Sequence, residues 1–388
     1  MPNFGQEMQL EVYGSARSTS SEPFPFACEE WEERARKVLS DEAYWYVAGA
    51  AGGGDTMRAN RDAFYEWRIR PRMLVDVTDR DVSVELFGRR FPVPVMLAPV
   101  GVQGILHPDG EAAAARAAAS IGVPVVLSNV SSVTLEEVAA ATGDSPHWFQ
   151  LYPGSNRDVM ASAIARAEAA HYSAIVVTLD TKMLGWREAD LRGGYLPFLK
   201  GQGIANYLSD PAFRGLLPRT PEEDPRSAIM LFLSLFANSA MSWSDVQWIR
   251  SRTRLPLLLK GILDPDDARI AIDKGADGVI VSNHGGRQVD GAVAALDALP
   301  AVVDAVAGAV PVLMDSGVRR GADVIKAIAL GARAVLVGRP YAYALATGGE
   351  EAVRHYLRCL IADIDINLAL SGRRTLAELN RSALERAA

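Results

Sequence analysis

Residues 311–337 read PVLMDSGVRRGADVIKAIALGARAVLV, and this stretch decides the fold. Two short apolar runs, at 311–314 and 334–337, flank a segment that begins at Gly321 and ends at Gly331. Unbroken apolar runs are typical of strands that are covered on both faces, and a helix between two such runs makes the strands parallel. The stretch therefore predicts a strand, a helix and a second strand of a parallel sheet.

Six further apolar runs of the same kind lie upstream, and a helix signal follows most of them. They occupy residues 94–98, 124–127, 148–151, 174–178, 256–259 and 278–281. Thr134 and Glu137 have the spacing of a capping box, and Asp264 followed by Pro265 is typical of a helix start. Eight strand–helix units within about 250 residues match a (β/α)8 TIM barrel better than an open, doubly wound sheet. We therefore predict an α/β fold of the TIM-barrel class.

The unit after the fourth strand is abnormally long. About 60 residues pass after Asp180 before a convincing helix pattern begins, at 242–251. The intervening segment contains several glycines, among them Gly193, Gly194, Gly201 and Gly203, and an acidic, proline-rich patch at 218–225. We expect a mobile lid, inserted at about 188–242, over the barrel mouth. Residues 1–90 are expected to form an N-terminal helical extension that contributes to the mouth, and residues 91–388 the barrel, with closing helices after 349.

Composition excludes several classes of protein. The chain has 388 residues and a formal net charge of −7, so it lacks the basic surplus of a nucleic-acid binder. Its two cysteines, Cys28 and Cys359, lie too far apart in sequence for a disulfide framework or a metal-ligand pair, which favours a reducing, cytoplasmic location. Residues 1–21 lack the pattern of a secretion signal, and the longest apolar run, 229–237, is far shorter than the roughly 20 residues of a membrane span.

Polar side chains follow seven of the eight predicted strands, where the active site of a TIM barrel lies. They are Ser128 and Asn129, Gln150 and Tyr152, Thr178 and Asp180, Lys260, the run 282–284 with Arg287, the run 315–319, and finally Gly338 and Arg339. Gly101 follows the first strand. This convergence is hard to explain without a bound ligand.

The last two strands predict a phosphate site. Gly317, Arg319, Gly338 and Arg339 offer backbone N–H groups and guanidinium groups where such barrels commonly hold a phosphate. The alternative is that the glycines form tight turns and the arginines are exposed. The sequence contains neither G-x-G-x-x-G nor a Walker loop, which disfavours NAD and ATP. A monophosphate cofactor fits better.

Of the five histidines, His284 is the best candidate for a general base. It follows the sixth strand near Arg287, and Asp180 could reach across the barrel to orient its ring. An arginine beside the base suits a substrate with a carboxylate. His107 is a rival, whereas the other three histidines (His147, His171 and His355) are expected to be structural or solvated.

Lys260 ends the fifth strand inside the same ring of residues. Its position alone is compatible with three roles: a Schiff-base lysine, a cation that stabilises a reduced cofactor, and a salt-bridged structural lysine.

The heptapeptide SNHGGRQ at 282–288 resembles the active-site signature of the FMN-dependent 2-hydroxy-acid oxidase and dehydrogenase family. The similarity runs from about Tyr46 to the C-terminus. Supporting matches are FQLY at 149–152, TLD at 178–180, GWR at 185–187, LKG at 259–261, DSGVR at 315–319 and GRP at 338–340. Chain length, the GWR tripeptide and Asn206-Tyr207 in the predicted lid make the chain most similar to the lactate 2-monooxygenase group.

The resemblance implies a role for each strand-end residue. His284 would be the base and Asp180 its partner. Four further side chains would bind the substrate carboxylate and hydroxyl: Tyr46, Tyr152, Arg187 and Arg287. Lys260 would face the flavin N1 and O2 region and stabilise the reduced ring, which leaves little room for a Schiff base. The FMN ring and phosphate would contact Ala98, Pro99, Ser128, Gln150, Thr178, Ser282, Asp315, Gly317, Arg319, Gly338 and Arg339.

Two positions bear on the product and the substrate. Gly101 falls near the reactive face of the flavin, where lactate 2-monooxygenases also have glycine and oxidases often have alanine. The resemblance thus implies that the keto acid stays bound and is oxidatively decarboxylated, with O2 as the electron acceptor. Val130 stands where glycolate oxidase has tryptophan, so an L-2-hydroxy acid larger than lactate is expected to fit. The implied partners are this acid, O2 and further copies of the chain, as a tetramer or octamer.

Alternatives remain at this stage. One is an oxidase or dehydrogenase that releases the 2-keto acid, with Gly101 serving only packing. Others are a Schiff-base lyase on a phosphate-binding barrel and a flavin-binding protein without activity. The apolar run at 229–236 falls where membrane-bound mandelate dehydrogenases have their anchor, but it lacks flanking Lys and Arg. We expect it to form a lid or a subunit contact.

Overall fold

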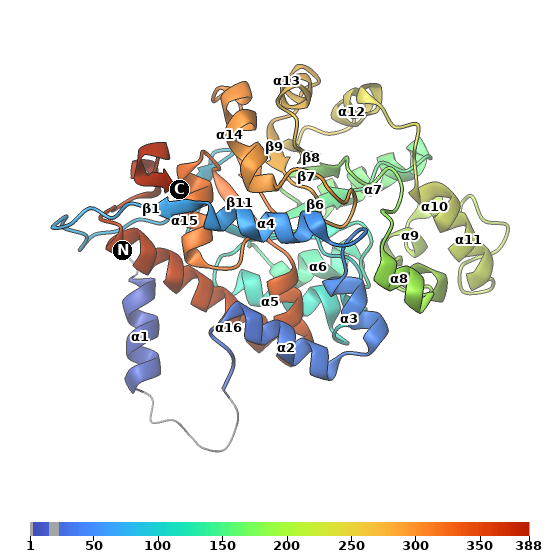
Figure 1. Cartoon of the computed structure of the whole chain (residues 1–388). Coiled ribbons are helices and arrows are strands. Elements are labelled where there is room, and N and C mark those ends of the chain that lie inside the picture. The colour runs from blue at the N-terminus through green and yellow to red at the C-terminus, as the bar shows by residue number, and fades with distance from the viewer. Residues whose placement is uncertain (1–2, 15–22, 388) are drawn as a thin grey trace.

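Eight strands of the computed structural model, which describes residues 3–14 and 23–387, form a closed parallel barrel in the order β10-β11-β4-β5-β6-β7-β8-β9. In chain order they are β4 (Val95–Leu97), β5 (Val125–Ser128), β6 (His147–Leu151), β7 (Ile175–Thr178), β8 (Leu257–Ile262), β9 (Gly278–Val281), β10 (Val312–Met314) and β11 (Ala334–Val337). All eight predicted strands are confirmed, and so is the TIM-barrel class (Figure 1).

Helices connect successive strands and cover the outside of the barrel. They are α5 (Gly110–Ala119), α6 (Leu135–Thr142), α7 (Arg157–Ala169), α12 (Trp243–Arg250), α13 (Pro265–Asp273), α14 (Ala295–Val306), α15 (Gly321–Ala329) and the long α16 (Arg339–Leu370). The predicted capping box of Thr134 and Glu137 is present at the start of α6, and Asp264 caps α13 with Pro265 in its first turn. The local signals thus set the helix starts as expected.

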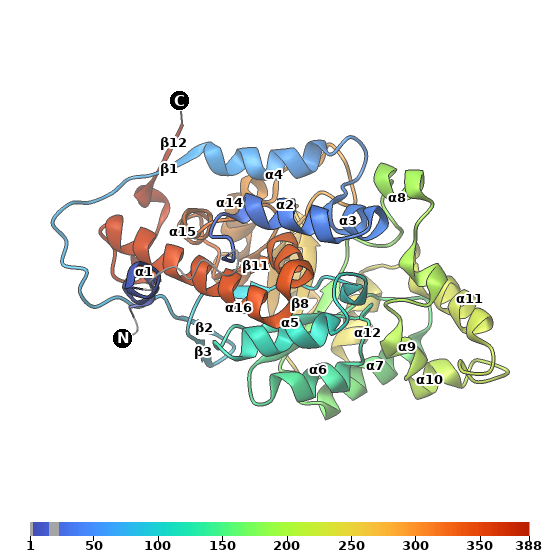
Figure 2. The ribbon, with the colours of Figure 1, turned by 90° about the horizontal axis from the view of Figure 1, so that it is seen from below.

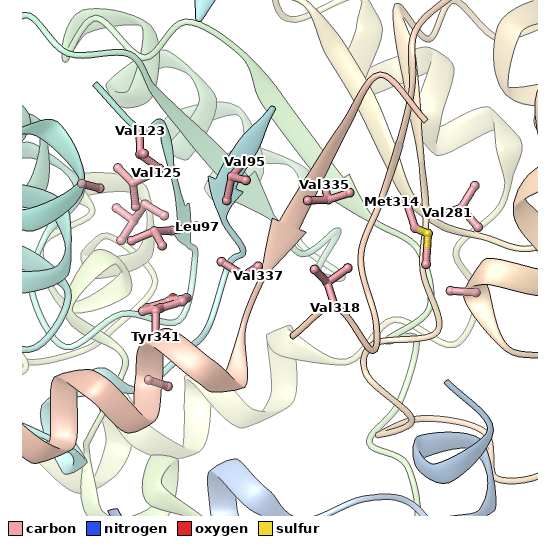
Figure 3. Packing of buried hydrophobic residues seen from close by; sticks show 14 of the residues in the cluster. Val95, Leu97, Val123, Val125, Val281, Met314, Val318, Val335, Val337 and Tyr341 are labelled. Carbon is pink, nitrogen blue, oxygen red and sulfur yellow. The ribbon is translucent and has the colours of Figure 1, made fainter. Parts of the chain in front are cut away.

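Two apolar layers stabilise the barrel. The inner layer fills the barrel with inward side chains, among them Met96, Trp148 and Leu313. The hairpin β2 (Val84–Leu86) and β3 (Arg89–Phe91) packs onto this layer, and the Phe87 ring centroid lies 5.9 Å from that of Trp148. The outer layer lies between strands and helices, and Figure 3 shows a part of it on β4, β11 and α16. Because side chains fill the barrel, a ligand must bind at its rim.

The N-terminal segment contains α1 (Phe4–Gly14), α2 (Cys28–Val38), α3 (Asp41–Ala48) and α4 (Asp55–Tyr65). These helices were expected. The sequence patterns missed the hairpin and the strand β1 (Trp67–Ile69), which pairs with β12 (Leu384–Arg386) at the other end of the chain. These strands have only three residues each, too few for a period-2 pattern to show.

The insertion between β7 and β8 is largely helical, so the expectation of about 60 residues without a convincing helix was wrong. It forms α8 (Glu188–Gly193), the 3-10 helix η2 (Pro197–Lys200), α9 (Ala205–Leu208), α10 (Pro211–Arg214) and α11 (Pro225–Phe236). Asp210 caps α10 and Asp224 caps α11, each followed by proline. Both views place α8 to α11 together at one side of the molecule (Figures 1 and 2).

In the closing segment, two helices meet within α16 at a kink at Gly348 and Gly349, where the backbone is not helical. The short 3-10 helices η3 (Leu376–Glu378) and η4 (Arg381–Ala383) follow, and then β12. Within the described ranges, no helix is long and apolar enough to cross a membrane. The stretch 1–21, which is expected to lack a secretion signal, falls partly outside the described residues, and its described part, 3–14, contains α1.

Candidate active site

A cavity opens at the C-terminal ends of the barrel strands, and together with the solvent at its mouth it encloses about 1030 Å³ that no protein atom fills. Most of the predicted site residues line it: Tyr46, Ala98, Pro99, Gly101, Val130, Tyr152, Arg187, Lys260, His284, Arg287, Asp315, Gly317, Arg319, Gly338 and Arg339. Five others do not line it. Ser128, Asp180 and Ser282 hydrogen-bond to the lining residues Val130, His284 and Lys260. Gln150 bonds to Ser128, and Thr178 pairs with Lys260 in the strand register.

His284 and Asp180 form a hydrogen-bonded pair beside the cavity. His284 Nδ1 lies 2.8 Å from Asp180 Oδ1, so the opposite nitrogen, Nε2, is the one that can accept a proton from a ligand. Burial lowers the pKa of His284 below its ordinary value, although Asp180 opposes this shift. Burial raises the pKa of Asp180, but its interactions with His284 and the charge of Lys260 lower it, and the net shift is downward. The two shifts favour a neutral imidazole beside an ionised carboxylate.

The backbone at His284 is constrained. Its φ of 58° lies in the left-handed region, which non-glycine residues rarely adopt, and Gly285 and Gly286 follow with positive φ. The Ser282 hydroxyl accepts a hydrogen bond from His284 N at 3.0 Å. Strain of this kind clusters at functional sites, where it holds a side chain in one orientation.

Lys260 is buried, and its ammonium group has two partners. Its Nζ donates to Ser282 Oγ at 2.8 Å and lies 3.0 Å from Asp315 Oδ2. Burial lowers the pKa of Lys260, but the carboxylates of Asp315 and Asp180 outweigh it and raise the pKa above its ordinary value. A Schiff-base lysine must be neutral to react, so these surroundings favour the role of a fixed cation.

Two arginines and two tyrosines line the same cavity. Tyr46 lies in α3, and Arg187 lies directly before the first helix of the insertion. Arg187 Nη2 donates to Gln288 Oε1 at 3.0 Å, and Arg287 Nη1 donates to Gly49 O at 2.8 Å. Burial, together with the charges of Arg187 and Arg339, lowers the pKa of Arg287. An anionic ligand would relieve this repulsion.

Tyr46 and Tyr152 are both buried, and burial raises the pKa of each hydroxyl. The Arg287 guanidinium lies 5.5 Å from the centre of the Tyr46 ring. Neutral phenols beside two cations are suitable hydrogen-bond donors to a carboxylate.

Unpartnered polar atoms lie at the ends of β6 and β7. Ser128 Oγ donates to Gln150 Oε1 at 3.2 Å, but Gln150 Nε2 and Thr178 Oγ1 are buried without a hydrogen-bond partner among the described residues. The strand register places Ser128 beside Gln150 and Thr178 beside Lys260. Buried polar groups without partners are rare, so these atoms indicate a bound group with hydrogen-bonding edges.

The predicted phosphate end is also part of the cavity. A Cβ on Gly338 would meet no atom closer than 3.7 Å, so its backbone borders open space. Arg319 lines the same end. Arg339 already donates to three backbone carbonyls, those of Val47, Gly285 and Gly49, at 2.8–3.1 Å. Only part of its guanidinium group therefore remains for a ligand.

The sequence analysis missed apolar residues that the insertion brings to the cavity, namely Leu184, Phe198 and Phe236. The ring centroid of Phe236 lies 5.1 Å from that of Tyr152 and 5.7 Å from that of Phe198. The apolar run at 229–236 was the available signal. It becomes α11, whose last residue is Phe236, so the expectation that it forms a lid agrees with its place beside the cavity.

Gly101 and Val130 approach each other closely in the wall of the cavity. A Cβ on Gly101 would lie 2.5 Å from Val130 O and 2.6 Å from Val130 Cγ2. Alanine at position 101 would therefore displace Val130, which itself lines the cavity.

The rival base, His107, does not line this cavity. It packs against α16, where a Cβ on Gly349 would lie 2.8 Å from its Nε2. His147 is buried at the start of β6 with its Nδ1 2.8 Å from Ser145 O, and His355 contacts the Phe24 and Phe26 rings. These positions agree with structural roles.

Comparisons with known proteins match almost the whole chain. Residues 35–386 match the family model described as FMN-dependent dehydrogenase. The chain is 43% identical over 366 residues to an L-lactate oxidase of Lysinibacillus sphaericus, with 94% of each chain covered. It is 45% identical over 358 residues to an FMN-dependent alpha-hydroxy acid dehydrogenase of Penicillium citrinum, covering 92% of this chain and 89% of the relative. A crystal structure of mandelate oxidase is similar with a TM-score of 0.82 and 40% identity, covering 94% of this chain and 98% of that chain.

Proposed function

Because the chain belongs to the family of FMN-dependent dehydrogenases that oxidise 2-hydroxy acids, we propose that it oxidises an L-2-hydroxy acid with O2 as the acceptor and decarboxylates it. The overall change is R–CHOH–COO⁻ + O2 → R–COO⁻ + CO2 + H2O. The observation that carries the proposal is that His284, bonded to Asp180, lines the same cavity as Arg187 and Arg287.

The cavity fits FMN by its own chemistry. Gln150 Nε2 and Thr178 Oγ1 are buried without partners and would bond the edge of a flavin ring, together with Ser128. Lys260 would place its charge beside the ring, while Gly317, Gly338 and Arg319 would hold the phosphate. Ala98 and Pro99 would contact the ring, and Arg339 would contribute the part of its guanidinium group that is not already bonded. When bound, FMN supplies a two-electron acceptor that amino-acid side chains lack.

The protein groups would bind the acid and move its proton. Arg187 and Arg287 would clamp the carboxylate, and the hydroxyls of Tyr46 and Tyr152 would donate to the carboxylate and the 2-oxygen. His284 Nε2 would accept a proton from the substrate, and Asp180 would stabilise the imidazolium that forms. These roles are supported by the shared cavity and by the low pKa of His284, which keeps the base neutral.

We propose a substrate with an apolar side chain larger than that of lactate. The walls that remain for such a side chain are apolar: Val130, Leu184, Phe198 and Phe236. The solved relatives include a mutant of mandelate oxidase with (S)-mandelic acid. Aromatic rings from the insertion would pack against an aromatic acid and keep water out.

The decarboxylating outcome requires that the keto acid stay bound while oxygen reacts. Two features support such retention: Phe198 and Phe236 of the insertion line the cavity, and Gly101 has no side chain to press on a ligand. The alternative, release of the 2-keto acid and hydrogen peroxide, is favoured by the names of the relatives, which include L-lactate oxidase.

Anaerobic titration tests the proposed activity. The purified protein should contain FMN, and its visible absorbance should bleach with L-lactate or (S)-mandelate but not with the opposite enantiomers. The proposed substrate class requires a higher kcat/KM for (S)-mandelate than for L-lactate. An FMN-containing protein that none of these acids reduces would overturn the proposal.

We further propose a homo-oligomer in the cytoplasm. Exposed apolar side chains near the cavity, Met183, Leu184 and Trp186, support a subunit contact. Cys28 and Cys359 are both free thiols, which suits a reducing compartment. Light scattering after size-exclusion chromatography and fractionation of the source cells test these two proposals.

A further inference from the structure

Glu111 is a buried carboxylate that lies just outside the active-site cavity. It stands in the first turn of α5, and 2% of its surface is exposed. Its Oε1 accepts hydrogen bonds from two backbone amides, Gln103 N at 2.8 Å and Ser132 N at 3.1 Å. Its Oε2 is buried and has no hydrogen-bond partner within the described part of the chain. Because burying a carboxylate costs free energy, packing alone does not explain this residue.

The two amides belong to the two loops that form one wall of the cavity. Gln103 lies in the loop after β4, which carries Gly101, and Ser132 lies in the loop after β5, which carries Val130. Gly101 and Val130 are the residues whose backbones approach so closely that a Cβ would lie 2.5 Å from Val130 O. Glu111 therefore joins the two loops within two residues of that contact.

One further bond joins the two loops, because Gly104 N donates to Ser132 Oγ at 2.8 Å. Other parts of the fold hold each loop by itself. Tyr341 on α16 donates to Ala98 O at 2.8 Å and accepts from Gln103 Nε2 at 3.0 Å. Asn206 in the insertion donates to Asn129 O at 3.1 Å. Glu111 connects the loop that α16 holds to the loop that the insertion holds.

The chemistry of Glu111 suits a bridge between amides. Burial raises its pKa to about 7, while the hydrogen bonds from Gln103 and Ser132 oppose that shift. Tyr46 and Tyr341 are the titratable groups whose own pKa values respond to its charge. A leucine of similar size would avoid the cost of a buried carboxylate, but it would leave both amides without an acceptor.

We propose that Glu111 is a positioning residue that fixes the spacing of Gly101 and Val130, and through it the size of substrate that the pocket accepts. The inference rests on the proposed substrate pocket. It concerns neither the proton transfer nor the binding of FMN, because Glu111 touches neither His284 nor the cavity.

Three substitutions of Glu111 distinguish the effects of its acceptor oxygen, its charge and its length. Glu111→Gln keeps an oxygen acceptor of the same reach without the charge. Glu111→Asp keeps the charge but is one methylene shorter, and Glu111→Leu keeps the approximate volume without any acceptor. Glu351→Leu, at an exposed glutamate on α16, is the matched control.

The main measurement is the ratio of kcat/KM for (S)-mandelate to kcat/KM for L-lactate. Glu111→Gln and the control should leave this ratio within about threefold of wild type. Glu111→Asp and Glu111→Leu should change it by about 10-fold or more, because a wall displaced by about 1 Å costs up to 100-fold. Hydrogen exchange at the amides of Gln103 and Ser132 should become faster in the Asp and Leu variants only, and FMN content should stay constant.

Unchanged ratios and unchanged exchange in all three variants would overturn the inference, as would a loss in Glu111→Gln equal to that in Glu111→Leu. If Glu111→Leu does not fold, Glu111→Asp decides the matter. If the wild type oxidises neither acid, the proposed function fails, whereas the exchange of the two amides still tests the bridge.

Discussion

His284 Nδ1 and Asp180 Oδ1 lie 2.8 Å apart, although 104 positions separate the two residues in sequence. The barrel creates this contact, because Asp180 follows β7 and His284 follows β9, and both strands end at the same rim. The carboxylate orients the ring so that Nε2 is left for a substrate. The contact therefore joins two strand ends in one hydrogen-bonded pair, to which we assign the acid–base role.

Removal of the imidazole should abolish proton transfer but not FMN binding. His284→Asn is expected to slow anaerobic flavin reduction by about 100-fold to 10,000-fold, the usual contribution of general base catalysis. FMN content and the melting temperature serve as controls for folding. A reduction rate within tenfold of wild type would assign the base to another residue.

The pH dependence should reflect a buried histidine base. The base works when it is unprotonated, and burial lowers its pKa from the ordinary value, against the opposing effect of Asp180. As pH falls, kcat/KM should therefore decline, and the decline should lie at lower pH than an exposed histidine would give. Asp180→Asn removes the charge that raises the pKa of His284, so the decline should move to still lower pH, with kcat reduced by up to about 10,000-fold. An unmoved decline would show that another group titrates.

Binding of the substrate carboxylate should depend on the planar guanidinium group of Arg187. Arg187→Lys retains the charge but loses the bidentate geometry, and hydrogen bonds to charged groups contribute about 1.5–3 kcal/mol each. KM for (S)-mandelate should rise about 10-fold to 100-fold. The corresponding amide, which lacks the carboxylate charge, should bind wild type and variant almost equally. An unchanged KM would remove Arg187 from the binding site.

The preference for larger or smaller acids should depend on the side chain at position 130. Val130 is buried in the cavity wall, so Val130→Leu adds one methylene to the space proposed for the side chain of the acid. One methylene changes discrimination by about 10-fold to 200-fold. We expect kcat/KM to fall more for (S)-mandelate than for L-lactate, whereas Val38→Leu, at an exposed position on α2, should change neither. Equal effects on both acids would contradict this assignment.

The barrel and the strand-end residues could be predicted because their signals are local. Each buried parallel strand is an apolar run of its own, and helix starts such as Thr134 with Glu137 are set within four residues. Once a barrel is predicted, polar residues after the strands must meet at one rim. The meeting of His284, Asp180 and Lys260 at this rim was predictable for this reason.

The residues that the insertion contributes to the cavity could not be predicted in the same way. Phe198 and Phe236 reach the cavity because η2 and α11 pack against each other, and their ring centroids lie 5.7 Å apart. Nothing in the local pattern around either residue indicates that contact. Glu111 was missed for a similar reason, since its partners belong to two loops that only the folded barrel brings together.

The fate of the product should depend on Gly101. Gly101→Ala forces Val130 to move, and overpacking of this kind costs about 1–3 kcal/mol. We expect the keto acid to leave sooner, so the variant should release more 2-keto acid and hydrogen peroxide than wild type. Catalase-coupled peroxide assays and chromatography of the acids measure the shift. An identical product ratio in both proteins would limit Gly101 to packing.

The most direct test of the proposed function is the product stoichiometry of the wild-type holoenzyme in air with (S)-mandelate. For each mole of O2 consumed, the account predicts one mole of CO2 and one mole of the shortened carboxylic acid, benzoate, with little free hydrogen peroxide. One mole of hydrogen peroxide and one mole of 2-keto acid, without CO2, would contradict it.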